Sequence, residues 1–177
     1  MPTGQSTYFD NPIYFNTANP FRAGGYIGQC TWYCWSKANA KAEAYPDRNL
    51  DTSYIPTSSA YKWYNEVSSS HKGSTPKNDC IAVWEGPTGE KNGHVAYVET
   101  WDGKTVCYSE ANWNSSRNTS NTIQVPSSVY NTIRNNVQTL APFVTVKSGG
   151  TDGKFKENTL SDFENRKPNF LGYIYLN

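Results

Sequence analysis

Three short apolar runs in the middle of the chain constrain its fold most strongly. They are rich in β-branched and aromatic residues and span residues 80–84, 94–99 and 105–110. Glycine and proline separate the first two, and the pair Asp102-Gly103, a hairpin signal, separates the last two. Consecutive strands joined by short connections pair most simply as an antiparallel meander. The centre of the chain therefore predicts an antiparallel sheet.

Helices are predicted before this sheet. Residues 29–44 contain neither proline nor glycine, and the end of the stretch is rich in alanine, which favours a helix. Thr57 or Ser58 is expected to cap a second, shorter helix that runs through Trp63 and Val67. Helices followed by strands indicate an α+β fold, with the first helix packed on the antiparallel sheet.

The last third of the chain is less regular. A short helix is expected around residues 129–137, and strands are expected near 143–147 and 171–176. Residues 149–168 are charged and rich in turn formers, so we expect a surface loop whose Lys and Arg residues are solvated.

The length of 177 residues, with 36% hydrophobic side chains, suits one compact core. Residues 1–18 are irregular and are expected to form an extended N-terminal lead-in, and residues 19–177 are expected to form a single domain. We expect a monomer.

Charge and hydropathy exclude several classes of function. The 16 Lys and Arg residues nearly balance 15 Asp and Glu residues, so the net charge of +1 argues against a nucleic-acid partner. No apolar run is long enough to insert in a membrane, and the N-terminus shows no signal peptide. Aromatic residues make up 15% of the chain, which suits a small core or a groove for a sugar or peptide.

Cys30 stands at the start of the predicted helix 29–44. The N-terminus of a helix stabilises a thiolate through its free N–H groups and its dipole, so this position favours a nucleophilic cysteine. Gly28 allows the backbone to turn closely, and the side-chain amide of Gln29 is able to sit beside an oxyanion.

A cysteine nucleophile needs a base, and the chain has two histidines. His71 lies in a serine-rich loop, whereas His94 opens a predicted strand and is the better candidate. Glu110, or alternatively Asn112, is expected to orient the imidazole. His94 opens its strand and Glu110 closes the neighbouring antiparallel one, so both fall at the same end of the sheet.

Three segments around these residues resemble the signatures of a known family. They are Gly28-Gln29-Cys30-Thr31-Trp32-Tyr33, Gly93-His94-Val95-Ala96-Tyr97-Val98-Glu99 and Ser109-Glu110-Ala111-Asn112-Trp113. They look like the three motifs, in order, of the CHAP domain, the cysteine, histidine-dependent amidohydrolase/peptidase, a papain-like fold that cuts bacterial peptidoglycan. The resemblance runs from about Asn19 to Tyr175.

The resemblance implies a role for each matched residue. Cys30 is the nucleophile, His94 the general base and Glu110 its orienting partner, with Asn112 assisting in the polar site. The Cys30 backbone N–H and Gln29 would hold the oxyanion. The implied reaction is cleavage of an amide through an acyl-enzyme, which needs no metal or organic cofactor.

The other cysteines have more than one interpretation. Cys34, one helical turn after Cys30, is not part of the family signature and is either a buried small hydrophobe or a trap for an oxidised Cys30. Cys80 and Cys107 lie in predicted strands, where they are core residues or form a disulfide.

Some relatives bind calcium through closely spaced acidic residues near the nucleophile. The nearest match here is Asp47, Asn49 and Asp51, which lacks the glycine and the distal glutamate of a full calcium loop. We therefore predict no metal site.

The resemblance implies a bacteriolytic peptidoglycan hydrolase. It would be an N-acetylmuramoyl-L-alanine amidase or an endopeptidase of the stem peptide or cross-bridge, acting in the extracellular space or cell wall as a secreted enzyme or an endolysin. Trp113 is a candidate for stacking on the substrate. The alternatives are a non-catalytic wall-binding module and a cysteine peptidase that acts on proteins.

Overall fold

The structure is a computed structural model that describes residues 9–113 and 121–177. Its helices are α1 (Pro20–Ala23), α2 (Cys30–Ala44), α3 (Ala60–Glu66), α4 (Tyr130–Leu140) and α5 (Leu160–Glu164), with short 3-10 helices η1 (Pro12–Tyr14), η2 (Pro46–Arg48), η3 (Ser69–His71) and η4 (Ser127–Val129). Its strands are β1 (Lys72–Gly73), β2 (Cys80–Trp84), β3 (His94–Trp101), β4 (Thr105–Ser109), β5 (Thr122–Val125), β6 (Thr145–Ser148), β7 (Lys156–Thr159) and β8 (Phe170–Tyr175).

The main sheet has six strands in the order β1-β8-β2-β3-β4-β7, and all its pairs are antiparallel. Strands β2, β3 and β4 form the predicted meander. The register pairs Trp84 with His94 and Tyr97 with Ser109, so the start of β3 and the end of β4 meet at one end of the sheet. The predicted α+β fold class is confirmed.

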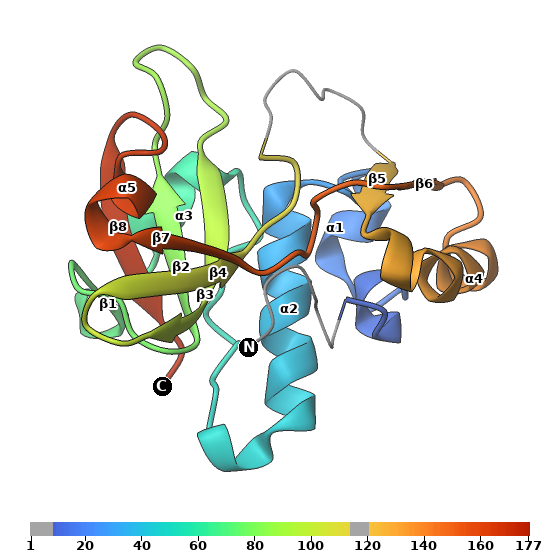
Figure 1. Cartoon of the computed structure of the whole chain (residues 1–177), viewed down its shortest axis with the longest axis horizontal. Helices are drawn as coiled ribbons and strands as arrows, with labels where there is room; N and C mark the ends of the chain where they lie inside the picture. The colour runs from blue at the N-terminus through green and yellow to red at the C-terminus, as the bar shows by residue number, and fades with distance from the viewer. Residues whose placement is uncertain (1–8, 114–120) are drawn as a thin grey trace.

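Helix α2 lies along one face of this sheet (Figure 1). It begins at Cys30, as predicted, and ends before Pro46, a residue that cannot continue a helix. Alternate residues of β2 and β3 face α2 and are fully buried: Ile81, Val83, Val95 and Tyr97. This packing places the first residue of α2 at the same end of the sheet as the start of β3.

The opposite face of the sheet is covered by α5, which corrects the prediction of a solvated loop over residues 149–168. Phe163 of α5 is fully buried against Trp84 and Tyr108, and β7 extends the sheet by pairing with β4. The segment is rich in charged residues, and its buried apolar side chains are those of Phe155 and Phe163. The high average polarity of residues 149–168 therefore conceals the two positions that pack in the core.

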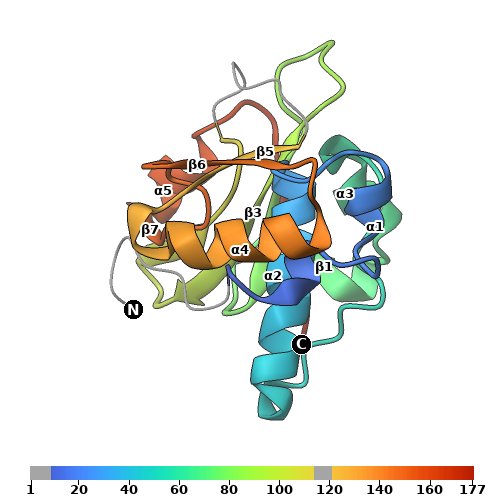
Figure 2. The same cartoon turned by 90° about the vertical axis from the view of Figure 1, so that its right-hand side faces the viewer.

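A second group of elements lies across α2 from the sheet. Strands β5 and β6 pair in parallel, and α4 packs beside them (Figure 1); in the turned view α4 crosses in front of α2 (Figure 2). The helix predicted at 129–137 and the strand near 143–147 are present, although β6 joins this small pair and not the main sheet. Strand β5 was not predicted, because four residues give too short a periodic signal.

Residues 9–18 are folded against α2, which corrects the prediction of an extended lead-in for this part of residues 1–18; residues 1–8 lie outside the described residues. Phe9, Tyr14 and Phe15 are fully buried and meet Trp32 of α2 with ring centroids 5.4–6.1 Å apart. The Trp32 indole donates a hydrogen bond to the Tyr14 carbonyl. These three aromatic residues, which stand among turn-forming residues in the sequence, are therefore part of the core.

A buried charge network ties α2 to the sheet. Glu99 of β3 accepts from Lys37 at 3.1 Å, Lys41 at 2.9 Å and the Ser109 hydroxyl at 2.8 Å. Lys41 also pairs with the buried Asp79. We call Lys37, Lys41, Asp79, Glu99 and Ser109 the buried charge network. It joins α2, β3 and β4, the elements that also carry or flank Cys30, His94 and Glu110.

Among the described residues, no helix combines the length and the apolar character that a membrane span requires.

Candidate active site

Cys30 is the first residue of α2, and its backbone takes part in a tight turn. Gly28 has a φ of +97°, and a Cβ at this position would lie 2.1 Å from the Thr122 carbonyl oxygen. Only glycine fits there. The turn leaves the half-buried Cys30 thiol at the positive end of a helix of 15 residues.

His94 and Glu110 meet where the register predicted. Nε2 of His94 lies 2.7 Å from Oε2 of Glu110, and both side chains are about 1% exposed. The imidazole therefore leaves Nδ1 for the Cys30 sulfur, and the two groups lie close enough for the charge of each to shift the pKa of the other. Gly93 lets β3 begin here, because a Cβ would lie 2.6 Å from the Tyr61 nitrogen and 2.7 Å from the Trp84 carbonyl oxygen. Glu110, and not Asn112, is thus the residue that contacts His94.

The charges of Cys30 and His94 support each other. Burial raises the pKa of the Cys30 thiol, but His94 and the backbone N–H groups of Val95 and Thr31 outweigh burial, so the net pKa is lowered. Burial lowers the pKa of His94, and Cys30 and Glu110 outweigh it, so this pKa is raised. The pair therefore favours a thiolate beside an imidazolium, which is the reactive form of a cysteine nucleophile.

Two cations hold the second oxygen of Glu110. Oε1 accepts from Lys156 at 3.1 Å and from Arg166. Burial raises the pKa of Glu110, but His94, Arg166 and Lys156 together bring it to about 2. Both cations come from the segment 149–168, so sequence reasoning missed them. Only the β7 and α5 packing brings them to Glu110.

Gln29 and Asn112 form the other side of the site. The Asn112 side-chain amide donates to Oε1 of Gln29, which leaves the Gln29 amide nitrogen free to donate. Asn112 has a φ of +52°, and its backbone N–H donates to the buried Asp152 at 2.9 Å. The Cys30 N–H has no acceptor within the helix. These two donors suit an oxyanion hole next to the thiol.

A groove of about 500 Å³ opens onto these residues. Cys30, His94, Gln29 and Asn112 line it together with Tyr26, Lys167 and the segment 57–60, which leads into the first residue of α3. A carbonyl that enters the groove is able to reach the thiol and both oxyanion donors.

The profile of the CHAP domain matches residues 21–112, just over half of the chain. This range contains Cys30, His94 and Glu110. The chain belongs to the CHAP family.

Two solved structures also resemble the chain. "The crystal structure of Ly7917" has 16% sequence identity and a TM-score of 0.42, and the match covers 94% of this chain and 62% of that one. "The crystal structure of Ly7917 with the hydrolyzing product of MDP" has the same identity and coverage and a TM-score of 0.43. This chain thus spans less than two thirds of the length of either. A search of curated protein sequences found no match.

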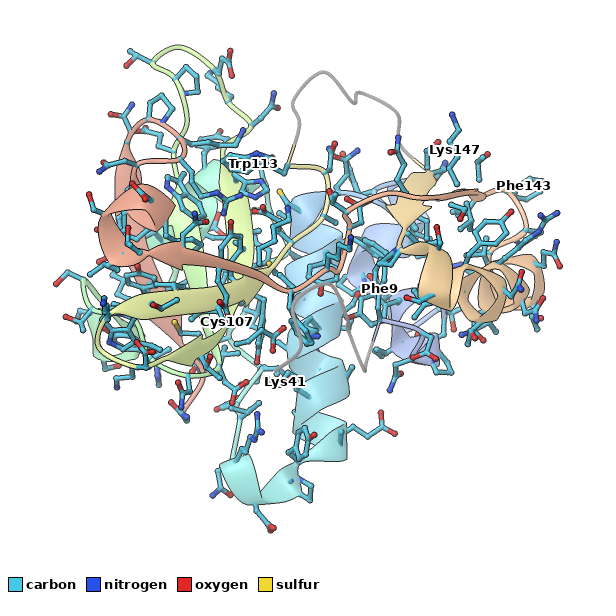
Figure 3. All side chains as sticks on the ribbon, in the orientation of Figure 1. Phe9, Lys41, Cys107, Trp113, Phe143 and Lys147 are labelled. Atoms are coloured by element: carbon cyan, nitrogen blue, oxygen red, sulfur yellow. The ribbon has the colours of Figure 1, made fainter. Side chains whose placement is uncertain are left out.

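Trp113 lies beside the candidate active site at the end of the sheet, near the start of α2 (Figure 3). Its ring meets His94 edge-on with centroids 5.0 Å apart. The Arg166 guanidinium lies 3.7 Å from the ring centroid and the Lys167 ammonium 4.6 Å from it. Trp113 is not among the described residues that line the groove. Its contacts indicate that it buttresses His94 and the cations, and stacking on substrate stays a prediction.

The other cysteines and His71 do not line the groove that holds Cys30 and His94. All four cysteines are free thiols, and Cys34 is fully buried in α2. Burial raises its pKa well above the usual range for a cysteine, so Cys34 is a poor nucleophile. His71 is exposed and stacks on Tyr54 with centroids 4.2 Å apart.

The residues considered as calcium ligands, Asp47, Asn49 and Asp51, are exposed or accept other hydrogen bonds. Asp51 accepts hydrogen bonds from the N–H and hydroxyl of Ser53, and Asp47 and Asn49 are exposed. Within the described ranges, no group of three or more His, Cys, Asp or Glu residues is arranged to hold a metal ion.

The pH dependence of the reaction rate is expected to follow from the ion pair between Cys30 and His94. We expect a bell-shaped profile of kcat/KM: acid protonates the Cys30 thiolate, and alkali removes the His94 proton needed by the leaving amine. Since Glu110 raises the pKa of His94, Glu110→Gln should move the alkaline limb to lower pH. Rates measured from acid to alkaline pH test this, and an alkaline limb that stays in place or rises would contradict it.

Proposed function

We propose that this protein is a peptidoglycan hydrolase that cleaves an amide bond through Cys30. The observation that carries the proposal is the arrangement of Cys30 beside His94, with His94 hydrogen-bonded to Glu110, at a groove in a chain of the CHAP family. This arrangement supplies a nucleophile, a proton carrier and an anchor for that carrier, the three parts that cysteine hydrolases need.

Acylation is the first half of the proposed reaction. The Cys30 thiolate attacks the carbonyl carbon of the substrate, and the negative charge moves to the carbonyl oxygen. The Cys30 N–H and the Gln29 amide stabilise that oxygen. Nδ1 of His94 then gives its proton to the amide nitrogen, the C–N bond breaks, and the amine leaves a thioester on Cys30.

Hydrolysis of the thioester completes the cycle. The neutral His94 takes a proton from water, the resulting hydroxide attacks the thioester carbon, and the thiolate leaves. Glu110 keeps the imidazole in the tautomer that presents Nδ1, because its carboxylate accepts from Nε2. Neither step needs a metal ion.

Two bonds in peptidoglycan fit this chemistry. One is the amide between N-acetylmuramic acid and the stem peptide, and the other is a peptide bond of the stem or cross-bridge. Peptidoglycan lies outside the cytoplasmic membrane, so the proposed place of action is the cell wall, for a secreted enzyme or a phage lysis enzyme.

Digestion of purified peptidoglycan tests the proposal. We expect soluble fragments, and mass spectrometry of their new ends will separate an amidase, which exposes lactyl groups, from an endopeptidase, which exposes amino-acid ends. Casein treated in parallel is expected to stay intact. Cleavage of casein with intact peptidoglycan would favour a protein peptidase, and no product from either would overturn the hydrolase.

A further inference from the structure

Lys167 is the one charged side chain outside the catalytic pair among the described residues that line the groove. The other lining groups are neutral: hydroxyls of Thr31, Thr57 and Ser59, side-chain amides, and the aromatic rings of Phe21 and Tyr26. No described carboxylate lines the groove. Glu85 and Glu90 lie in the exposed loop before β3 and do not reach the lining.

The Lys167 ammonium has a fixed place but no counter-ion among the residues that the structure describes. It lies 4.6 Å from the centroid of the Trp113 ring, a cation–π contact that holds the side chain beside His94. It makes no ion pair or hydrogen bond with any described residue. A half-buried ammonium at a groove is therefore left to be paired by whatever enters.

The surrounding charges do not cancel that of Lys167. Cys30 and His94 balance each other as an ion pair, and Glu110 has both Arg166 and Lys156 on a single oxygen. The buried Asp152, which accepts from the Asn112 N–H, balances the second of these cations, so Lys167 gives the site a local excess of one positive charge. A local excess of positive charge attracts anionic groups.

We propose that the groove prefers amide substrates that carry a free carboxylate near the bond to be cut, and that Lys167 is the counter-ion of that carboxylate. The inference rests on the proposed hydrolase function and narrows its substrate class. Wall peptides contain carboxylates that are either free or converted to primary amides, so Lys167 would distinguish these two chemical forms.

The test crosses two substrates with four enzymes. Soluble peptidoglycan fragments are used as they are or after conversion of their carboxylates to primary amides with carbodiimide and ammonia. The enzymes are wild type, Lys167→Met, Lys167→Arg and Lys104→Met. Lys104 lies exposed in the turn between β3 and β4, at the far end of β3 from His94, and provides the matched loss of one lysine charge.

We expect wild type and Lys104→Met to cleave the carboxylate form about fivefold more efficiently than the amidated form, as for a partly exposed ion pair. Lys167→Met should lose this preference by slowing only on the carboxylate form, and Lys167→Arg should retain it. A preference that survives in Lys167→Met overturns the proposal. Equal slowing on both forms also overturns it, because Lys167 would then act through Trp113 and His94.

Binding separates this inference from the hydrolase proposal. The affinity of each fragment preparation for Cys30→Ala, with and without Lys167→Met, is measured by calorimetry. A carboxylate preference that depends on Lys167 supports the inference even if wild type cleaves neither form, an outcome that would overturn only the hydrolase. Equal affinities for the two forms overturn the inference.

Discussion

Replacement of Cys30 by alanine is expected to lower peptidoglycan cleavage by more than about 10⁴-fold while the fold is retained. The thiol forms the acyl bond in the proposed mechanism, and among the described cysteines Cys30 is the one that lines the groove together with His94. The substitution removes one atom from a half-buried position, so little packing is lost. Released fragments counted by mass spectrometry, with circular dichroism as a check on folding, measure the effect.

Cys34→Ala is the matched control, because this thiol lies one turn further along α2. It is fully buried, and burial raises its pKa. We expect activity to persist and stability to fall by about 1 kcal/mol, since a small buried group is removed. Iodoacetamide should inactivate wild type by modifying Cys30 first. Full cleavage by Cys30→Ala, or loss of cleavage in Cys34→Ala alone, would contradict the assignment of the nucleophile.

Glu99→Gln is expected to lower the free energy of unfolding by about 3–5 kcal/mol. The substitution keeps the shape of the side chain but leaves Lys37 and Lys41 with less negative charge in a region where all three side chains are at most about 1% exposed. Burial already lowers the pKa of Lys37, and Glu99 counteracts this. The loss should therefore shrink as alkaline pH removes the Lys37 proton.

Urea unfolding of Glu99→Gln beside Glu157→Gln measures this effect. Glu157 is an exposed residue of β7, so the same change of charge there should alter stability by less than about 0.5 kcal/mol. A loss below about 1 kcal/mol in Glu99→Gln would mean that the buried lysines find other partners. The expected loss also bears on the site, because the buried charge network joins α2 to β3 and β4.

Local patterns in the sequence were enough for the elements that carry the site. The short apolar runs of β2, β3 and β4 and their short connections predicted the meander, and the stretch free of proline and glycine predicted α2. Antiparallel pairing then placed His94 and Glu110 at the same end of the sheet, and the structure puts them 2.7 Å apart. This prediction worked because strand register is a local property set by turns.

The contacts that modulate the site were not predictable in the same way. Lys156 and Arg166 lie in a segment that looks solvated, and Lys37 and Lys41 lie on a helix that shows no strong apolar stripe. Each of these cations is buried or half-buried because a distant carboxylate meets it. A charged side chain by itself favours solvent, and burial becomes favourable only when an oppositely charged partner meets it. The sequence shows the charge but not the distant partner.

The sequence by itself determined the α+β order, the position of Cys30 at the start of α2 and the placement of His94 and Glu110 at the same end of the sheet, because these follow from turns, periodicity and register over short distances. Only the tertiary structure decided that His94 contacts Glu110 and not Asn112, that residues 149–168 close the far face of the sheet, and that Phe9 and Tyr14 enter the core. It also decided that Lys167 faces the groove without a counter-ion among the described residues. These features depend on pairs of residues far apart in the chain, and their free energy appears only when folding brings the two partners together.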